Sequence, residues 1–235
     1  MDKILRVENL KKNNILNGIS FSVDKGEMVA IMGPSGSGKS TLLYNVSGMD
    51  KADSGSVILG DKEILSLKES EKSELRLNSM GFVFQNMNML SNLTVIENIM
   101  YPAIHDKKGT SKKTIENKAI ALMQKLGIED LKDRKINQVS GGQLQRACIC
   151  RSYINNPKII FADEPTGALN QSSTTEVMNS FRQINEDGAT VLIVTHDSKV
   201  ASMCNRVLFL VDGEIRAEWK NGDSDINEWL DDLEW

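Results

Sequence analysis

Gly33-Pro-Ser-Gly-Ser-Gly-Lys-Ser40 is the stretch that decides the fold, because it matches the phosphate-binding pattern of a glycine-rich turn closed by lysine and serine. It follows Glu27–Met32, a nearly continuous apolar run typical of a strand buried on both faces. It precedes Ser40–Val46, whose apolar residues have helical spacing. At background residue frequencies a chance match occurs on the order of once per hundred such chains. The strand–loop–helix setting makes chance rarer still.

The loop has a chemical use that explains its residue types. Glycines let successive backbone N–H groups turn inward to an anion, and the helix that starts near Lys39 adds its positive dipole end. Lys39 should reach the β- and γ-phosphates of ATP, and the Ser40 hydroxyl should ligate Mg²⁺. The residues expected to contact nucleotide here are Gly33, Ser35, Gly36, Ser37, Gly38, Lys39, Ser40 and Thr41. The loop therefore predicts ATP binding and hydrolysis.

Length, charge and cysteine content limit the function classes. With 235 residues, 40% of them hydrophobic, the chain can form one large α/β domain or two modest ones. Its net charge of −4 gives no electrostatic reason to expect a nucleic-acid partner. No apolar run approaches the ~20 residues that span a bilayer, and the N-terminus lacks the long apolar stretch of a secretory signal. Cys148, Cys150 and Cys204 fit neither a disulfide framework nor a zinc pattern, so we expect packing thiols in a reducing cytosol.

Runs typical of strands alternate with helical patterns, which predicts an α/β fold with a parallel sheet. Strand-like runs cover residues 19–23, 56–59, 81–84, 159–162, 191–194 and 207–211. Asp212-Gly213, after the last of these runs, is a hairpin signal. From Asn86 to about Asn156 helical spacing dominates, so this block is expected to be a helical insertion.

The C-terminal tail, residues 225–235, predicts a short acidic helix. Its apolar residues Ile226, Trp229, Leu230 and Leu233 share one helical face. The helix either docks on its own domain or binds a partner, and the sequence leaves both open.

Two further motifs carry chemistry. A buried strand ends in Asp163-Glu164, and because neighbouring strand side chains point to opposite sides, the two acids can have different jobs. Asp163 would hold Mg²⁺ through its water shell, and Glu164 would polarise the attacking water. Ser140-Gly-Gly-Gln143 opens a helix, where its serine and backbone N–H groups make a second anion site or simply cap the helix. A phosphate-loop enzyme needs one such site per chain, so the second would serve a nucleotide held by another subunit.

At this point the chain resembles a nucleotide-binding domain of the ATP-binding-cassette family over nearly its whole length. The phosphate loop, Gln85, Ser140–Gln143, Asp163-Glu164 and His196 follow one another in the family's order. The resemblance implies a single domain of residues 1–235, an α/β P-loop NTPase core with a mixed sheet and an N-terminal antiparallel β subdomain. The core and β subdomain would take residues 1–85 and 157–235, and an inserted α-helical subdomain residues 86–156.

The resemblance also implies a role for each motif. Gln85 would touch Mg²⁺ and sense a membrane partner, and His196 would contact the γ-phosphate and orient the attacking water. The catalytic set is then Glu164, His196 and Lys39. The Mg²⁺ set is Ser40, Gln85 and Asp163, and Ser140, Gly141, Gly142 and Gln143 bind the nucleotide of a second copy in a head-to-tail dimer.

The sequence departs from the family pattern in three places. Val139 stands where leucine is usual, a mild change of apolar packing. Asn170 replaces an aspartate in the loop after Glu164, which keeps a hydrogen-bonding carbonyl but loses the charge and puts coupling between the two sites in doubt. Asn14 falls where the family usually has an aromatic ring that stacks on adenine, an interaction worth about 1–3 kcal/mol. We therefore expect weaker base discrimination.

Residues 84–99 and 162–169 resemble one branch of the family, which contains macrolide exporters, lipoprotein-releasing systems and bacitracin-type peptide-resistance transporters. The resemblance implies a separate integral-membrane permease as partner and a place on the cytoplasmic face of a bacterial membrane. The function that we expect first for such a transporter is antimicrobial-peptide resistance or export. A sensing ATPase that moves no substrate, or a lipoprotein-releasing ATPase, remains open. A role in DNA repair is disfavoured, because the long coiled coils or zinc modules of such chains are absent.

Overall fold

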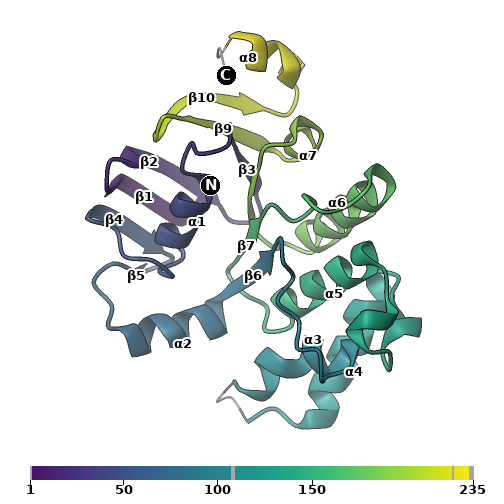
Figure 1. Cartoon of the computed structure of the whole chain (residues 1–235). Coiled ribbons are helices and arrows are strands. Elements are labelled where there is room, and N and C mark those ends of the chain that lie inside the picture. The colour runs from purple at the N-terminus through teal and green to yellow at the C-terminus, as the bar shows by residue number, and fades with distance from the viewer. Residues whose placement is uncertain (1, 107–108, 224, 233–235) are drawn as a thin grey trace.

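A six-stranded sheet of mostly buried strands forms the centre of the molecule (Figure 1). The computed structural model describes residues 2–106, 109–223 and 225–232. In spatial order the strands are β10 (Glu214–Lys220), β9 (Arg206–Val211), β3 (Met28–Met32), β8 (Val191–Thr195), β7 (Ile159–Asp163) and β6 (Met80–Phe84). All neighbours are parallel except β10, which is antiparallel to β9. Every residue of β3, β7 and β8 is buried, which explains their unbroken apolar sequences.

The antiparallel edge of this sheet comes from the expected hairpin. Asp212 and Gly213 connect β9 to β10, and both have positive φ, 49° and 73°. Two-residue loops of this kind match the twist of the flanking strands, and glycine and aspartate tolerate the conformation. The sheet is therefore mixed, as predicted.

The N-terminal segment forms a separate antiparallel sheet with the order β2-β1-β4-β5. Its strands are β1 (Lys3–Lys12), β2 (Leu16–Asp24), β4 (Ser54–Leu59) and β5 (Lys62–Glu63). Leu5, Val7 and Leu10 of β1 face a core that also contains Leu42 and Leu43 of helix α1 (Lys39–Val46). One face of the six-stranded sheet completes this core, so α1 lies between the two sheets.

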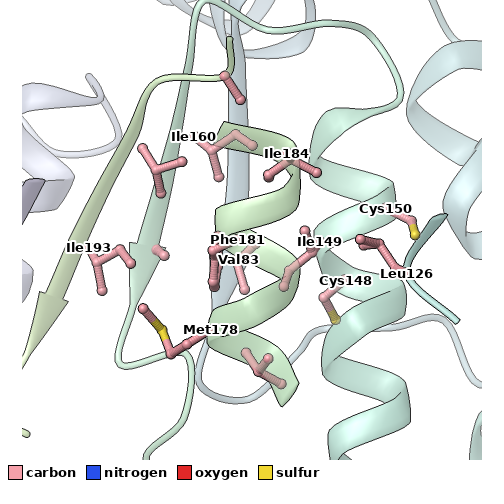
Figure 2. Packing of buried hydrophobic residues seen from close by; sticks show 14 of the residues in the cluster. Val83, Leu126, Cys148, Ile149, Cys150, Ile160, Met178, Phe181, Ile184 and Ile193 are labelled. Atoms are coloured by element: carbon pink, nitrogen blue, oxygen red, sulfur yellow. The ribbon is translucent and has the colours of Figure 1, made fainter. Parts of the chain in front are cut away.

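The other face of the six-stranded sheet is covered by α5 (Gly141–Tyr153) and α6 (Gln171–Glu186). Figure 2 shows Phe181 and Ile184 of α6 between Ile149 of α5 and Ile160 of β7. All three cysteines are buried, and Cys148 and Cys150 lie within this packing. Burial raises the pKa of Cys148 to about 11 and that of Cys204 to about 12. The thiols are packing groups, as expected.

Helices occupy the middle of the chain between β6 and β7. They are α3 (Val95–Ile104), α4 (Lys112–Lys125), two short 3-10 turns (Glu129–Leu131 and Ile136–Gln138) and α5. Thr94 and Glu97 form a capping box at the start of α3, which satisfies the first free backbone donors. The division into a core and a helical subdomain at residues 86 and 156 stays a prediction.

The remaining helices lie at the surface. They are α2 (Glu69–Ser79), α7 (Ser198–Ser202) and α8 (Ile226–Asp232). In α8, Ile226 is buried, and Trp229 stacks on Phe209 with ring centroids 6.4 Å apart. The described part of the tail thus docks on its own domain, while Leu233 lies outside the described residues. Among the described residues, no helix has the length and apolar character needed to cross a bilayer.

Candidate nucleotide site

The phosphate loop joins β3 to α1 and borders a cavity of about 380 Å³. The lining residues are Ile15, Ser35, Gly36, Gly38, Lys39, Ser40, Thr41 and Glu164. Gly33 does not line the cavity; it packs against β9, where a Cβ atom would be 2.1 Å from the carbonyl oxygen of Leu210. Gly38 has φ of 100°, a left-handed conformation that glycine adopts without strain. Ser37 is buried beside Gly33. Of the eight residues expected to contact nucleotide, six line this cavity.

Lys39 crosses the loop. Its ammonium group donates to the carbonyl oxygens of Gly33 and Pro34, each at 2.8 Å. Burial lowers the pKa of Lys39, and the carboxylates of Glu164 and Asp163 act in the opposite direction. The side chain is therefore a buried cation whose natural partners are anionic oxygens.

Asp163 is the last residue of β7 and meets the phosphate loop directly. Its Oδ1 accepts a hydrogen bond from the Ser40 hydroxyl at 2.9 Å, and its Oδ2 accepts one from the Tyr44 hydroxyl at 2.7 Å. The hydrogen bond to Asp163 raises the pKa of Tyr44 to about 12. Two residues expected to hold Mg²⁺, Ser40 and Asp163, are thus brought together.

Glu164 follows Asp163 but turns toward the cavity. Its φ of 44° is in the left-handed region, which costs a non-glycine residue on the order of 1–3 kcal/mol. A hydrogen bond from its N–H to the carbonyl of Val194, 3.0 Å long, holds this turn. The strained turn separates the two acids, so that Asp163 faces the loop serine and Glu164 faces the cavity.

His196 lies just beyond the end of β8, next to Glu164. The distance from His196 Nδ1 to Glu164 Oε1 is 3.0 Å, and 62% of the His196 side chain is exposed. A carboxylate only accepts hydrogen bonds, so His196 Nδ1 is the donor. The structure therefore pairs the two residues that the sequence expected to act on the attacking water.

Gln85 is placed by the sheet register. Phe84 pairs with Asp163, so Gln85 is the first residue beyond the pair. Its amide nitrogen is 2.9 Å from the position that a Cβ atom on Gly167 would take. Gln85 thus packs against the loop that follows Glu164, and among the described residues it makes no hydrogen bond to Ser40 or Asp163.

The donor set at this site suits Mg²⁺. Hydroxyl, carboxylate and amide oxygens are hard ligands, and Mg²⁺ in nucleotide sites takes few protein ligands because phosphates and water supply the rest.

Ser140–Gln143 does not join the cavity of its own chain. Ser140 caps α5: its hydroxyl accepts from the Gln143 N–H at 3.3 Å, and the Gln143 side chain accepts from the Ser140 N–H at 2.9 Å. Ser140 and Gly141 are exposed, whereas Gly142 packs on α6, where a Cβ atom would be 2.9 Å from Cβ of Ser173. The capping interpretation is therefore satisfied within the chain, and the exposed turn faces outward.

Two residues of this region were missed by sequence reasoning. Ile15, not Asn14, lines the cavity; it is 41% exposed and packs beside Gly38. Asn14 is exposed with φ of 58°. Tyr44 follows Ser40 by four residues, a spacing that puts both on one helix face and could have indicated their shared partner.

Comparison with known proteins shows which family the chain resembles in sequence. A family model described as "ABC transporter" matches residues 16–167. The chain belongs to the ABC transporter family. The bacitracin export ATP-binding protein BceA of Halalkalibacterium halodurans is 43% identical over 95% of this chain and 88% of its own length. The lipoprotein-releasing system ATP-binding protein LolD of Aquifex aeolicus is 43% identical over 93% of this chain and 98% of its own. A macrolide export ATP-binding/permease protein, MacB of Aggregatibacter actinomycetemcomitans, is 44% identical over 88% of this chain but only 32% of its own length.

Solved structures agree with the family. A dimeric bacterial ABC transporter cassette has a TM-score of 0.84 and 37% identity, and the match covers 92% of this chain and 98% of that one. A post-hydrolysis state of the same cassette, bound to ADP and Pi, has a TM-score of 0.83 and 36% identity over the same shares of the two chains. The predicted α/β cassette fold is confirmed. This ABC cassette is an ATPase.

Proposed function

We propose that the chain is the ATP-hydrolysing subunit of a transporter for antimicrobial-peptide resistance or export, and that it powers a separate integral-membrane permease. The carrying observation is the cavity that the phosphate loop, the buried cation Lys39 and Glu164 line together, with His196 paired to Glu164. The similarity to a bacitracin export ATP-binding protein supports the substrate class. Such a partner would hold the subunit at the cytoplasmic face of a bacterial membrane.

ATP would bind with its phosphates in the loop. Backbone N–H groups of the turn and the start of α1 supply partial positive charge, and Lys39 exchanges its carbonyl partners for the β- and γ-phosphates. Ser40, Asp163 and Gln85 would hold Mg²⁺, which neutralises phosphate charge when bound. The exposed Ser140–Gln143 turn is left for the nucleotide of a second copy.

Hydrolysis would use the pair formed by Glu164, which lines the cavity, and His196. Glu164 takes the proton of a water molecule whose oxygen attacks the γ-phosphorus, and the bond to the β–γ bridging oxygen breaks to leave ADP. His196 donates through Nδ1 to Glu164 and so fixes the direction of that carboxylate. Nε2 can also donate to the γ-phosphate only when the imidazole is protonated.

Two copies would form the working unit. Head-to-tail pairing places the Ser140–Gln143 turn of one copy over the phosphate loop of the other. Similarity to a dimeric cassette supports self-association. Each ATP contacts both copies only in the closed dimer, so ATP binds the closed state more tightly than the open state and drives closure. Loss of the γ-phosphate by hydrolysis lets the dimer open.

A second hollow gives the permease a place to act. A cavity of about 470 Å³ lies between α2, β6 and the helices of the middle block. Apolar side chains line much of it, including those of Met80, Phe82, Phe84, Leu90 and Tyr101. Phe84 precedes Gln85, which packs on the loop after Glu164. An apolar helix end of a permease in this hollow would therefore contact Phe84, the residue next to Gln85.

A lipoprotein-releasing function is the second candidate. The observation in its favour is that the lipoprotein-releasing relative has the same 43% identity as the bacitracin relative and is matched over 98% of its own length. Cells that lack the chain and its permease would separate the two functions. Peptide-resistance function predicts sensitivity to bacitracin-type peptides, and lipoprotein release predicts lipoproteins retained in the inner membrane.

Glu164→Gln tests the mechanism. The amide keeps the shape but cannot accept the proton, so the variant should bind ATP, stop hydrolysis and accumulate as a dimer seen by light scattering with ATP but not with ADP. Glu186→Gln, at an exposed glutamate near the end of α6, is the matched control and should behave as wild type. Hydrolysis at the wild-type rate in Glu164→Gln would overturn the assignment of the base. A dimer that survives Ser140→Arg in the Glu164→Gln background would overturn head-to-tail pairing.

A further inference from the structure

The Asp163 carboxylate is held at both oxygens by one helix. Ser40 and Tyr44 lie one turn apart on α1, and their hydroxyl groups donate to Oδ1 at 2.9 Å and Oδ2 at 2.7 Å. Asp163 is only 8% exposed, so the two protein donors take the place that water would otherwise have. A hydroxyl bonded to a carboxylate is a charge-assisted hydrogen bond, stronger than one between neutral groups.

The hydroxyl of Tyr44 has a task that packing does not explain. The ring packs against the apolar core under the small sheet, together with neighbours such as Leu42 and Leu43. A phenylalanine ring would fill that space equally well. The phenolic oxygen instead reaches across to β7, 119 residues away in sequence.

Two donors on opposite oxygens fix the plane of a carboxylate. The terminal torsion of an aspartate is broad and nearly two-fold, so one donor alone leaves the group free to rotate. With Tyr44 bonded to Oδ2, Oδ1 stays directed at the Ser40 hydroxyl, which is the other oxygen expected to face the cation. Groups that orient metal ligands in this way change metal affinity by about 10- to 100-fold when they are removed.

We propose that Tyr44 is a positioning residue for Mg²⁺, which acts by fixing the Asp163 carboxylate through its hydroxyl group. This rests on the proposed role of Asp163 in holding the cation. The role of Tyr44 is a further one, because Tyr44 lies outside the phosphate loop and orients the Asp163 carboxylate without contacting the cation itself. Nucleotide binding without a divalent cation does not depend on this orientation.

Tyr44→Phe removes the hydroxyl and keeps the ring. We expect Mn²⁺ binding in the presence of ADP, followed by electron paramagnetic resonance, to weaken about 10-fold. The Mg²⁺ concentration at half-maximal ATPase rate should rise by a similar factor, while kcat at saturating Mg²⁺ changes little. ADP affinity in EDTA should stay unchanged. Tyr153→Phe, at the far end of α5, is the matched loss of a tyrosine hydroxyl and should leave all three quantities as in wild type.

Two further variants make the result decisive. Tyr44→Met fills much of the ring's space without a donor and should show the same loss, which covers the case in which Tyr44→Phe does not fold. Asp163→Asn separates the two levels of the argument. If Asp163→Asn weakens Mn²⁺ binding and Tyr44→Phe does not, the positioning role of Tyr44 is wrong. If Asp163→Asn also leaves Mn²⁺ binding unchanged, the proposed role of Asp163 is wrong.

Discussion

Ile15 offers a quantitative test of how this cassette holds the base of its nucleotide. The residue lines the cavity beside the phosphate loop and packs against Gly38. The β9–β10 turn fixes its position, because the N–H of Asn17 donates to the Gly213 carbonyl at 2.8 Å. We therefore expect Ile15 to make an aliphatic contact with the base, in place of the aromatic contact that the family resemblance implies.

The size of that contact follows from exposure. Burying a whole isoleucine side chain is worth about 1.5–3 kcal/mol. Because 41% of Ile15 is still exposed, complete cover by a base would add about 0.6–1.2 kcal/mol. Ile15→Ala should therefore weaken nucleotide binding about 3- to 8-fold. An apolar contact does not distinguish purines, so ADP and GDP should weaken by the same factor.

Isothermal titration calorimetry with ADP and GDP measures both factors without hydrolysis. Leu90→Ala is the matched control, since Leu90 is 42% exposed but lines the other hollow. Unchanged Kd values in Ile15→Ala would mean that the base does not lie on this residue. A wild-type preference for adenine over guanine above about 10-fold would mean that other groups read the base, and the expected weak discrimination would be wrong.

Three other predictions concern the backbone around the site and the core thiols. Gly33→Ala would place a methyl group 2.1 Å from the Leu210 carbonyl oxygen, so calorimetry should show that ADP binding is lost. Gly36 has open space around it, so Gly36→Ala should bind ADP more tightly than Gly33→Ala does. Arg151→Met removes the guanidinium N–H groups that donate to the carbonyl oxygens of Met87 and Asn88. Hydrogen–deuterium exchange in residues 86–88 should then rise at least several-fold, and unchanged exchange would show that Arg151 does not hold this segment. The three buried thiols should not react with Ellman's reagent at pH 8 until urea unfolds the chain. Their pKa values in the folded chain lie above the unfolded value of 9.0. The free energy of unfolding, measured by urea melts, should therefore fall as the pH rises above about 9.

The elements that the sequence predicted well are those in which local pattern and burial agree. The apolar runs of β3, β7 and β8 are buried throughout, so their composition alone indicates central strands. The phosphate loop needs its glycines wherever it occurs. The hairpin after β9 was found because Asp212-Gly213 suits positive φ values.

Other features depend on contacts that no local pattern contains. Helix α2 was not predicted, because only Leu75 of its eleven residues is buried and the rest are mostly polar. The spacing of Ser40 and Tyr44 puts both on one face of α1, but it does not name Asp163, 119 positions away, as the acceptor of the Tyr44 hydrogen bond. Residues 13 and 14 both adopt positive φ, and Ile15, the next residue, lines the cavity. The position at which the family usually has an aromatic ring does not indicate this side chain.

Asn170 brings these observations to bear on communication between two sites. Its side chain accepts from the Ser173 N–H at 2.9 Å and so caps α6, and asparagine caps a helix as well as aspartate does. The neutral residue therefore costs the isolated chain little. Ser173 in turn packs against Gly142, in the turn proposed to serve a second copy, while Gly167, three residues before Asn170, packs against Gln85.

Packed contacts thus connect the proposed hydrolysis site, through residues 164–173, to the turn proposed to serve the other copy. Coupling carried by such contacts needs the shape of the segment and not the charge of residue 170. Asn170→Asp should then leave cooperativity of ATP hydrolysis nearly unchanged, whereas Gly142→Ala, whose methyl group would lie 2.9 Å from Cβ of Ser173, should reduce it. A large gain of cooperativity in Asn170→Asp would show instead that charge at the dimer interface carries the signal.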